Sequence, residues 1–261
     1  MNLIDSHCHL NYAGLAERQD EVLANARARG IAGFLNISTR QREWGDIVGT
    51  AERNADVWAT VGVHPHEADA HPDLGAAALV EAAAHPKVVA IGECGLDYYY
   101  DKSDRAAQRE TFQAHIEAAR ETGLPLVVHT RDAEDDTAEM LTREVAKGGV
   151  TGVLHCFTGS ADLARTGIDL GFYVSISGIV TFKNAKDLQE TAKIIPQDRL
   201  LVETDSPFLA PPGAPRSRNE PEWVRVTAAW VAEARGNDVE AMSHGLVGAY
   251  DRTFPRSRAR T

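Results

Sequence analysis

Residues 2–10, NLIDSHCHL, contain the pattern that decides the fold. A short apolar run is followed there by two histidines, His7 and His9, which are separated by Cys8. Successive side chains of a β-strand point to opposite faces, so both imidazoles share one face and Cys8 lies on the other. We therefore expect a strand over 2–8 whose carboxyl end presents a pair of imidazoles.

Similar short segments recur along the chain and alternate with Ala-rich segments that have a helical pattern. Several of the short runs are apolar at nearly every position, as strands are when both faces are covered. Seven further strands are predicted at 31–37, 57–63, 88–93, 125–129, 150–156, 171–176 and 199–204. Helices are predicted at 14–29, 40–54, 73–85, 104–122, 132–147, 160–170, 184–195, 220–235 and 238–250. Asp104 and Ser160 are expected N-caps, and Gly123 stands where a helix should end.

Alternating strands and helices predict a parallel sheet, which is either open or closed into an eight-stranded barrel. No GxGxxG or Walker-type loop follows any predicted strand, so the usual signature of the open, doubly wound sheet is missing. Eight β-then-α units fit a barrel, and the 261 residues contain no composition break or linker. We expect an α/β protein with one (β/α)8 TIM-barrel domain over residues 1–261.

The composition argues against several classes of protein. The 27 basic residues are outnumbered by 38 acidic ones, and a net charge of −11 argues against a broad basic surface for nucleic acid. No apolar run approaches the roughly 20 residues of a membrane span, and MNLIDSHCHL lacks the pattern of a secretory signal. The three cysteines have no CxxC spacing and are expected to be small buried side chains in a reducing compartment. We expect a cytoplasmic monomer that does not contact membranes.

Residues capable of metal binding or substrate contact gather at the carboxyl ends of the predicted strands. They are His7, His9, His64, His66, Glu93, His129, His155 and Asp205. In a closed barrel all of these strand ends open onto one mouth, where the active site lies. In an open sheet the first and last strands could share a site only as neighbours, so this distribution favours closure.

Nitrogen and oxygen donors without thiolates suit a divalent cation. Six of these residues are predicted ligands: His7, His9, Glu93, His129, His155 and Asp205. One zinc-like ion takes only three or four protein ligands, so we predict two cations, Mg²⁺, Mn²⁺ or Zn²⁺, that share Glu93. Two cations would outweigh the charge of two carboxylates, which favours an anionic substrate. Asp205 is expected to take the proton from the attacking water.

Weaker signals lie beside this set. His64 and His66 are predicted to bind substrate, although each alone also fits a structural histidine. Arg131 is predicted to contact an anionic substrate at the mouth, and it could equally cap the following helix. The tyrosines at 98–100 could stack on a base, and at least one of them is expected only to pack.

Four further histidines and three other charged residues carry predictions of their own. We expect the histidines to be solvent-exposed; they are His71, His85, His115 and His244. Arg216 and Arg218 either reach a phosphate or keep their loop soluble. Glu203 is expected to face away from Asp205, although alternation often fails at the end of a strand.

Six motifs occur in order along the chain: IDSHCHL, GVHPHEA, IGECGLDYY, PLVVHTRDA, GVLHCFTGS and LLVETDSPFL. From residue 4 to about residue 221 the chain closely resembles the TatD family of metal-dependent deoxyribonucleases, within the amidohydrolase-type barrels. The resemblance implies metal ligation by the six residues named above, with Glu93 shared, and phosphate contact by His64. His115 stands where the family usually has Gln. The segment APRSRNEP at 214–221 keeps only the last four residues of the family's RGKRNEP.

The residues and the resemblance together predict a divalent-metal-dependent hydrolase that cleaves phosphodiester bonds in DNA. We expect exonucleolytic cleavage of DNA ends or single-stranded DNA, in which hydroxide held by the cations attacks phosphorus and Asp205 handles the proton. An ester or aminoacyl-tRNA deacylase, or another amidohydrolase-type activity, could use the same site. A third interpretation is a metal-bound scaffold that binds a partner at the barrel mouth, which would require a closed coordination shell.

Overall fold

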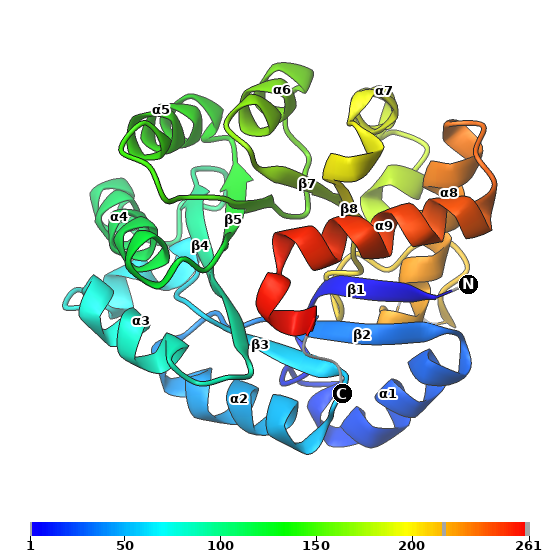
Figure 1. The fold of residues 1–261 in the computed structure, drawn as a ribbon, viewed down its shortest axis with the longest axis horizontal. Helices are drawn as coiled ribbons and strands as arrows, with labels where there is room; N and C mark the ends of the chain where they lie inside the picture. The colour runs from blue at the N-terminus through cyan, green and yellow to red at the C-terminus, as the bar shows by residue number, and fades with distance from the viewer. Residues whose placement is uncertain (1, 216–217, 259–261) are drawn as a thin grey trace.

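The computed structural model describes residues 2–215 and 218–258 and confirms the predicted (β/α)8 barrel (Figure 1). Eight parallel strands pair in chain order, from β1 beside β2 to β7 beside β8. The strands are β1 Leu3–Cys8, β2 Ile31–Asn36, β3 Val57–Val61, β4 Val88–Asp97, β5 Leu126–Arg131, β6 Gly152–Leu154, β7 Tyr173–Ile176 and β8 Leu200–Val202. The helices are α1 Gln19–Ala28, α2 Trp44–Arg53, α3 Ala76–Ala83, α4 Arg105–Thr122, α5 Glu134–Val145, α6 Ala161–Asp169, α7 Lys186–Ile194, α8 Val224–Ala234 and α9 Val239–Thr253.

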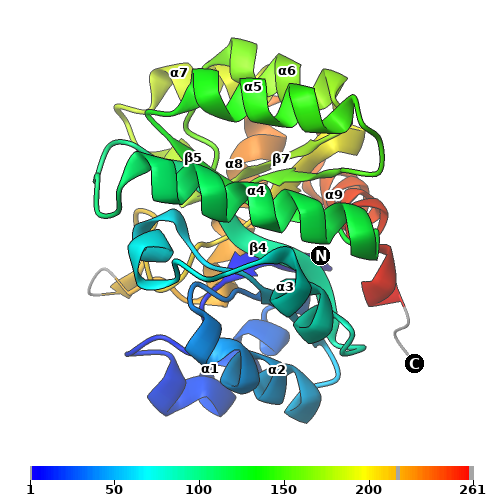
Figure 2. The same cartoon turned by 90° about the vertical axis from the view of Figure 1, so that its left-hand side faces the viewer.

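The helices surround the strands, and Figure 2 shows α4 and α5 on the outside of the barrel. The Asp104 carboxylate accepts hydrogen bonds from two backbone N–H groups in the first turn of α4, and the Ser160 hydroxyl accepts one in α6. Gly123 ends α4 in the left-handed conformation, with φ of 69°. These contacts confirm three predicted helix boundaries.

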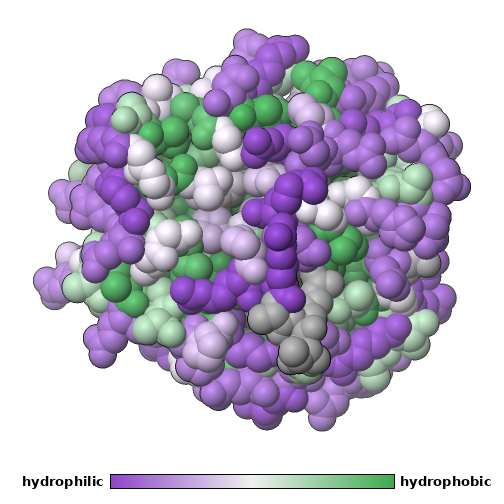
Figure 3. Space-filling view, in the orientation of Figure 1, coloured by the Kyte–Doolittle hydropathy of each residue, from purple (hydrophilic) through white to green (hydrophobic). Residues whose placement is uncertain are grey.

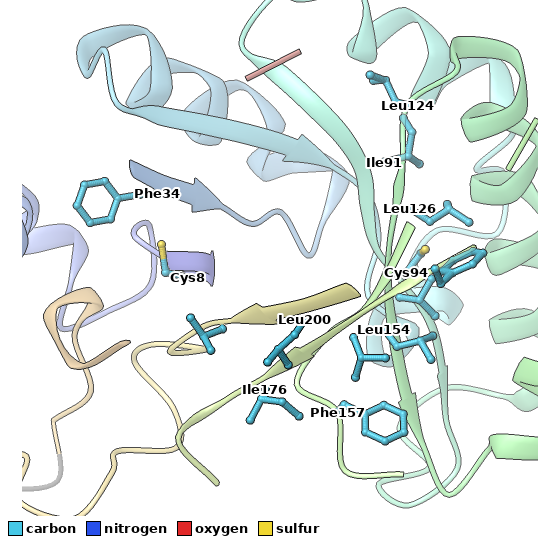
Figure 4. Close-up of a cluster of buried hydrophobic side chains, with 14 of the residues drawn as sticks. Cys8, Phe34, Ile91, Cys94, Leu124, Leu126, Leu154, Phe157, Ile176 and Leu200 are labelled. Atoms are coloured by element: carbon cyan, nitrogen blue, oxygen red, sulfur yellow. The ribbon is translucent and has the colours of Figure 1, made fainter. Parts of the chain in front are cut away.

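Apolar side chains fill the layer between strands and helices. Figure 4 draws part of this layer, including Cys8, Phe34, Cys94, Leu126, Leu154 and Ile176. Cys8 and Cys94 are fully buried, as predicted. Cys156 is partly exposed and its thiol donates to the Ser177 hydroxyl, so the prediction of a buried apolar side chain is wrong there.

A second apolar cluster fills the barrel interior towards the amino ends of the strands. It contains Ile4, Trp58, Val89, Leu201 and Tyr250. Tyr250 belongs to α9, which crosses this end of the barrel in Figure 1. The amino end is therefore closed by packing, and the polar strand ends gather at the opposite end.

Strand β4 is longer than predicted, because it continues past Glu93 to Asp97. Glycine usually weakens a strand, and the sequence has Gly95 in this extension. In the structure Gly95 has φ of 125° and pairs with His129 of β5. A Cβ at Gly95 would lie 2.0 Å from the carbonyl oxygen of His129, so glycine permits this close pairing.

The first and last strands meet at a seam, which we define as the contact between residues 5–9 and 204–206. The His9 N–H donates to the Ser206 carbonyl at 2.8 Å. The buried Asp5 carboxylate accepts hydrogen bonds from the Thr204 N–H at 2.9 Å and the Thr204 hydroxyl at 2.6 Å. These bonds hold Asp205 against the carboxyl end of β1.

Among the described residues, no helix combines the length and the apolar character needed to cross a bilayer. On the face drawn in Figure 3, hydrophilic side chains surround separate hydrophobic patches.

Candidate metal centre

The six side chains predicted to bind metal converge at the carboxyl ends of the strands. Their positions are His7 in β1, Glu93 in β4, His129 in β5, and His9, His155 and Asp205 just beyond β1, β6 and β8. All six belong to groups of three residues whose donor atoms lie within 4.8 Å of one another. Residues distant in sequence therefore form one polar cluster.

Four donor atoms of this cluster surround a single point, and we call their residues the first set: His7, His9, Glu93 and Asp205. His7 Nε2 lies 3.3 Å from His9 Nε2, 3.4 Å from Glu93 Oε2 and 3.5 Å from Asp205 Oδ1. His9 Nε2 lies 3.3 Å from Asp205 Oδ1 and 3.9 Å from Glu93 Oε2. Donor atoms bound at about 2.1 Å to one tetrahedral cation lie about 3.4 Å apart. The first set therefore fits one cation in its present positions.

The other carboxylate oxygen of Glu93 faces a different pair of histidines. Oε1 lies 2.8 Å from His155 Nε2 and 3.4 Å from His129 Nδ1. We call Glu93, His129 and His155 the second set. Because the two oxygens of one carboxylate face two sets, Glu93 has the geometry that a shared ligand needs. Both sets offer the nitrogen and oxygen donors that a divalent cation takes, and the number and identity of the cations stay a prediction.

Two buried carboxylates fix the histidines of the second set. Neither was predicted from the sequence to belong to the site. Glu203 Oε1 lies 3.3 Å from His155 Nδ1, and Asp97 Oδ2 lies 3.1 Å from His129 Nε2. Each carboxylate accepts the N–H of its histidine, so the other ring nitrogen is directed towards Glu93. The even spacing of Asp97 from Glu93 along one strand was the available signal for Asp97.

These two carboxylates also change the charge of the site. With Asp97 and Glu203, four carboxylates lie in or directly against the two sets. If the imidazoles are neutral, these four carboxylates would offset the charge of two divalent cations. The predicted excess of positive charge would then disappear, and attraction of an anionic substrate would need basic groups outside the two sets.

His64 lies beside the second set as a hydrogen-bond donor. Its Nδ1 accepts a hydrogen bond from the backbone N–H of His66 at 3.0 Å, so Nε2 carries the proton and faces Glu93 Oε1 at 3.2 Å. A protonated Nε2 has no lone pair for a cation. Burial lowers the pKa of His64 to about 4, so the ring is neutral at pH 7. The His66 ring instead contacts Asp97, with Nε2 2.7 Å from Oδ2.

The charges of the cluster result from burial opposed by neighbouring groups. Burial alone would raise the pKa of Glu93, but the surrounding imidazoles, with His155 foremost, hold this pKa well below its usual range. The pKa of Asp205 is lowered because the hydrogen bond to His9 and nearby imidazoles outweigh burial. Burial would lower the pKa of His155, but Glu93 and Glu203 raise it well above its ordinary value. Both predicted carboxylate ligands are therefore anionic at neutral pH.

Close backbone packing positions Glu93. A Cβ on Gly62, which follows β3, would lie 2.3 Å from the carbonyl carbon of Gly92. Glycine at position 62 therefore lets the chain pass directly against the residue that precedes Glu93. The Gly62 carbonyl also accepts hydrogen bonds from Ser38 and Trp44, each at 3.0 Å, which fixes its place.

The predicted substrate residue Arg131 stands at the end of β5. Its guanidinium carbon lies 4.2 Å from the ring centre of Tyr99. Helix α5 begins without a side-chain cap, so the helix-cap interpretation of Arg131 is wrong. The Tyr98 hydroxyl donates to Asp136 at 2.5 Å, which assigns Tyr98 to packing, whereas Tyr99 and Tyr100 are exposed.

Three other predictions have different outcomes. His115 was expected to be exposed, but it is fully buried and accepts the Val63 N–H at 2.9 Å, so that prediction is wrong. His244 is exposed as predicted, whereas His71 and His85 are partly buried. Glu203 was expected to face away from Asp205, but both carboxylates reach the metal centre, Glu203 at His155 and Asp205 at His9, so that prediction is wrong. Arg218 is exposed, and Arg216 lies outside the described residues.

Comparisons with known proteins agree with this geometry. A family model described as TatD related DNase matches residues 4–255. An uncharacterized metal-dependent hydrolase of Escherichia coli strain K12, YcfH, is 43% identical over 260 residues, which are 97% of this chain and 96% of that protein. The 3′-5′ ssDNA/RNA exonuclease TatD of Klebsiella pneumoniae strain 342 is 36% identical over 244 residues, with 91% and 92% covered.

A solved structure has the same fold. The crystal structure of YJJV, a TatD homolog from Escherichia coli K12, superimposes with a TM-score of 0.91 and 26% identity. The match covers 97% of this chain and 98% of that chain. A family match over nearly the whole length, joined to a convergent set of nitrogen and oxygen donors, leads to one conclusion: the chain belongs to the TatD family of metal-dependent hydrolases.

Proposed function

We propose that this protein hydrolyses phosphodiester bonds in DNA, from ends or in single strands, with two divalent cations bound by the first and second sets. The observation that carries the proposal is the placement of the two Glu93 oxygens, 3.4 Å from His7 Nε2 and 2.8 Å from His155 Nε2. Two cations held a short distance apart suit phosphodiester cleavage because one assists the attacking oxygen and the other the leaving oxygen. The similarity to a TatD protein named as a 3′-5′ ssDNA/RNA exonuclease supports this substrate class.

Each residue of the two sets has a role in this proposal. When bound, the cations would activate water and neutralise the charge that develops on the phosphoryl oxygens. His7 and His9 would hold the first cation and His129 and His155 the second, and Glu93 would be shared between them. Asp97 and Glu203 orient the imidazoles of the second set through the hydrogen bonds described above.

Asp205 and His64 act on the reacting groups. The Asp205 side chain is 14% exposed, compared with 3% for Glu93, so it is the carboxylate of the first set that faces the open mouth. We assign it the proton of the attacking water. The His64 Nε2–H, which now faces Glu93, is placed to donate to a phosphoryl oxygen at the second set. A barrel mouth admits a strand end more readily than an intact duplex, which favours exonucleolytic cleavage.

Removal and return of metal tests this proposal. Chelator-treated protein should lose cleavage of a single-stranded oligodeoxynucleotide, and Mg²⁺, Mn²⁺ or Zn²⁺ should restore it. H129A and D205N should each lower kcat/KM by at least about a hundredfold, because each removes a ligand. H244A and D162N are matched controls, since these side chains are 74% and 92% exposed on α9 and α6. Unchanged cleavage in H129A and D205N would overturn the proposal.

The substrate class is tested with the same preparations. We expect kcat/KM for a nucleotide phosphodiester to exceed that for carboxylic esters and aminoacyl esters. The opposite ratio would reassign the site to an esterase or deacylase. We further propose that the chain acts as one catalytic domain and as a monomer, so that activity should elute at the mass of a single chain.

A further inference from the structure

Two exposed aromatic rings stand at the mouth, next to the second set. Tyr99 and Tyr100 follow β4 and are 55% and 51% exposed. Their ring centres lie 4.9 Å apart and the ring planes are nearly perpendicular, at 88°. The pair thus forms a step of two aromatic surfaces with no role in the apolar core.

A single buried carboxylate ties this step to the second set. Asp97 Oδ1 accepts the backbone N–H of Tyr99 at 3.0 Å and that of Tyr100 at 2.9 Å. Asp97 Oδ2 holds His129 of the second set and also the ring of His66. The Tyr100 ring lies 5.4 Å from the His66 ring, centre to centre. Asp97 therefore connects the two tyrosines directly to the predicted ligand His129 and fixes their position beside it.

Basic groups accompany the aromatic step. The Arg131 guanidinium carbon lies 4.2 Å from the centre of the Tyr99 ring and 5.0 Å from that of Tyr100. Lys102 Nζ lies 5.6 Å from the Tyr100 ring centre. Because Glu93 and Asp205, together with the adjacent Asp97 and Glu203, would offset the charge of two divalent cations, Arg131 and Lys102 supply positive charge for an anionic backbone beside the site. Aromatic rings can stack on the bases of a single strand, and adjacent basic side chains can contact its phosphates.

We propose that Tyr99, Tyr100 and Arg131 form a subsite that stacks an unpaired base of single-stranded nucleic acid and contacts its phosphate. This inference rests on the proposed function, because it assigns the nucleotide next to the bond that is cleaved. The subsite excludes paired bases, since a base within a duplex is already stacked on its neighbours. It therefore selects single strands and frayed ends over intact duplex.

The test compares binding of oligonucleotides with and without single bases. The holoenzyme is titrated with a fluorescein-labelled, phosphorothioate-linked hexathymidylate and with versions that carry one abasic residue at each position in turn. Replacing both tyrosines, Y99A with Y100A, should weaken binding of the complete oligomer by about five- to 150-fold, the range for one lost base stack. The difference in affinity between the wild type and this double variant should be smaller for the oligomer that lacks the stacked base. Y99F with Y100F should bind like the wild type, because the rings remain.

I194A is the matched control, because Ile194 is 48% exposed but ends α7, whose chain leads to the amino end of β8. An equal loss at every abasic position, no loss, or no binding of the oligomer by the wild type would overturn the subsite. If the wild type cleaves DNA but the tyrosine substitutions do not change oligonucleotide binding, the subsite is refuted and the proposed function stands. If binding depends on one base but the protein does not cleave DNA, the subsite stands and the proposed function is refuted.

Discussion

Glu203 Oε1 lies 3.3 Å from His155 Nδ1 and also accepts the backbone N–H of Cys156 at 2.8 Å. One buried carboxylate thus fixes both the ring of a predicted ligand and the backbone that carries it. The opposite ring nitrogen is directed at Glu93. The second set therefore depends on a residue that is not among the six predicted ligands.

Replacing Glu203 should weaken metal binding without removing a ligand. We expect E203Q to lower cation affinity by about 10- to 100-fold, the usual effect of losing a carboxylate that orients a ligand histidine. Competition with a chromogenic chelator measures this change. E144Q is the control, because Glu144 is equally buried but pairs with Arg120 and Lys147 on the outside of the barrel. Equal affinities for E203Q and wild type would contradict the role assigned to Glu203.

A methyl group at position 62 should disturb the centre through the backbone. G62A places a Cβ 2.3 Å from the carbonyl carbon of Gly92, so β3 and β4 must separate beside Glu93. We expect a loss of about 1–3 kcal/mol in the free energy of unfolding, together with loss of activity. Urea denaturation and kcat/KM check both effects. G45A, whose Cβ would meet nothing within 4 Å in α2, should keep wild-type activity and stability or gain slightly.

His115 should make the fold sensitive to acid. Burial lowers its pKa to about 4 from the ordinary value of 6.5, so below pH 6.5 the unfolded chain binds a proton that the folded chain does not. The stability that depends on neutral His115 is complete above pH 6.5 and is lost as the pH falls towards 4. At pH 5 the loss is about 2 kcal/mol.

His115 pairs its Nδ1 with the Thr111 carbonyl at 2.7 Å and accepts the Val63 N–H, and glutamine can replace both hydrogen bonds without titrating. H115Q should therefore lose less unfolding free energy than the wild type between pH 7 and pH 5. Urea denaturation at both pH values, with H244Q as the exposed control, measures the difference. A wild-type pH dependence retained in full by H115Q would show that other groups cause it.

Nucleic acid binding should depend weakly on salt. The net charge of −11 and the small number of basic side chains beside the site, Arg131 and Lys102, imply few phosphate contacts. For single strands each contact contributes about 0.7 to the slope of log K against log salt, so we expect a slope of magnitude about 2 or less. R131Q should reduce the slope by about 0.7, and R165Q, on α6, should not change it. A steep slope in the wild type would indicate a larger basic surface than the sequence predicts.

The sequence allowed the barrel and the six convergent candidate ligands to be predicted because strand geometry relates position to direction. His7 and His9 share a face by alternation alone, and closure of the barrel brings Glu93 and Asp205 to them. Asp97 was missed because the predicted strand ended at Glu93. Pairing with β5 extends β4 to Asp97 through Gly95, and a single sequence does not reveal that pairing.

The features that could not be predicted from the sequence depend on contacts between distant segments of the chain. His115 lies on a polar helix pattern, and only the approach of Val63 explains its burial. Glu203 was expected to face away from Asp205, which is wrong, and its contact with His155 depends on the end of another strand. Whether an imidazole accepts or donates, as for His64, depends on one backbone N–H and cannot be inferred from residue type.

The seam between residues 5–9 and 204–206 has a consequence for the integrity of the molecule. His9 lies near the amino terminus and Asp205 in the last third of the chain, so a nascent chain that has not reached position 205 lacks part of the first set. The same is true of a proteolytic fragment that has lost either residue. Tight cation binding therefore requires that both segments are present and joined at the seam, and a fragment without one of them would lack a complete hydrolytic centre.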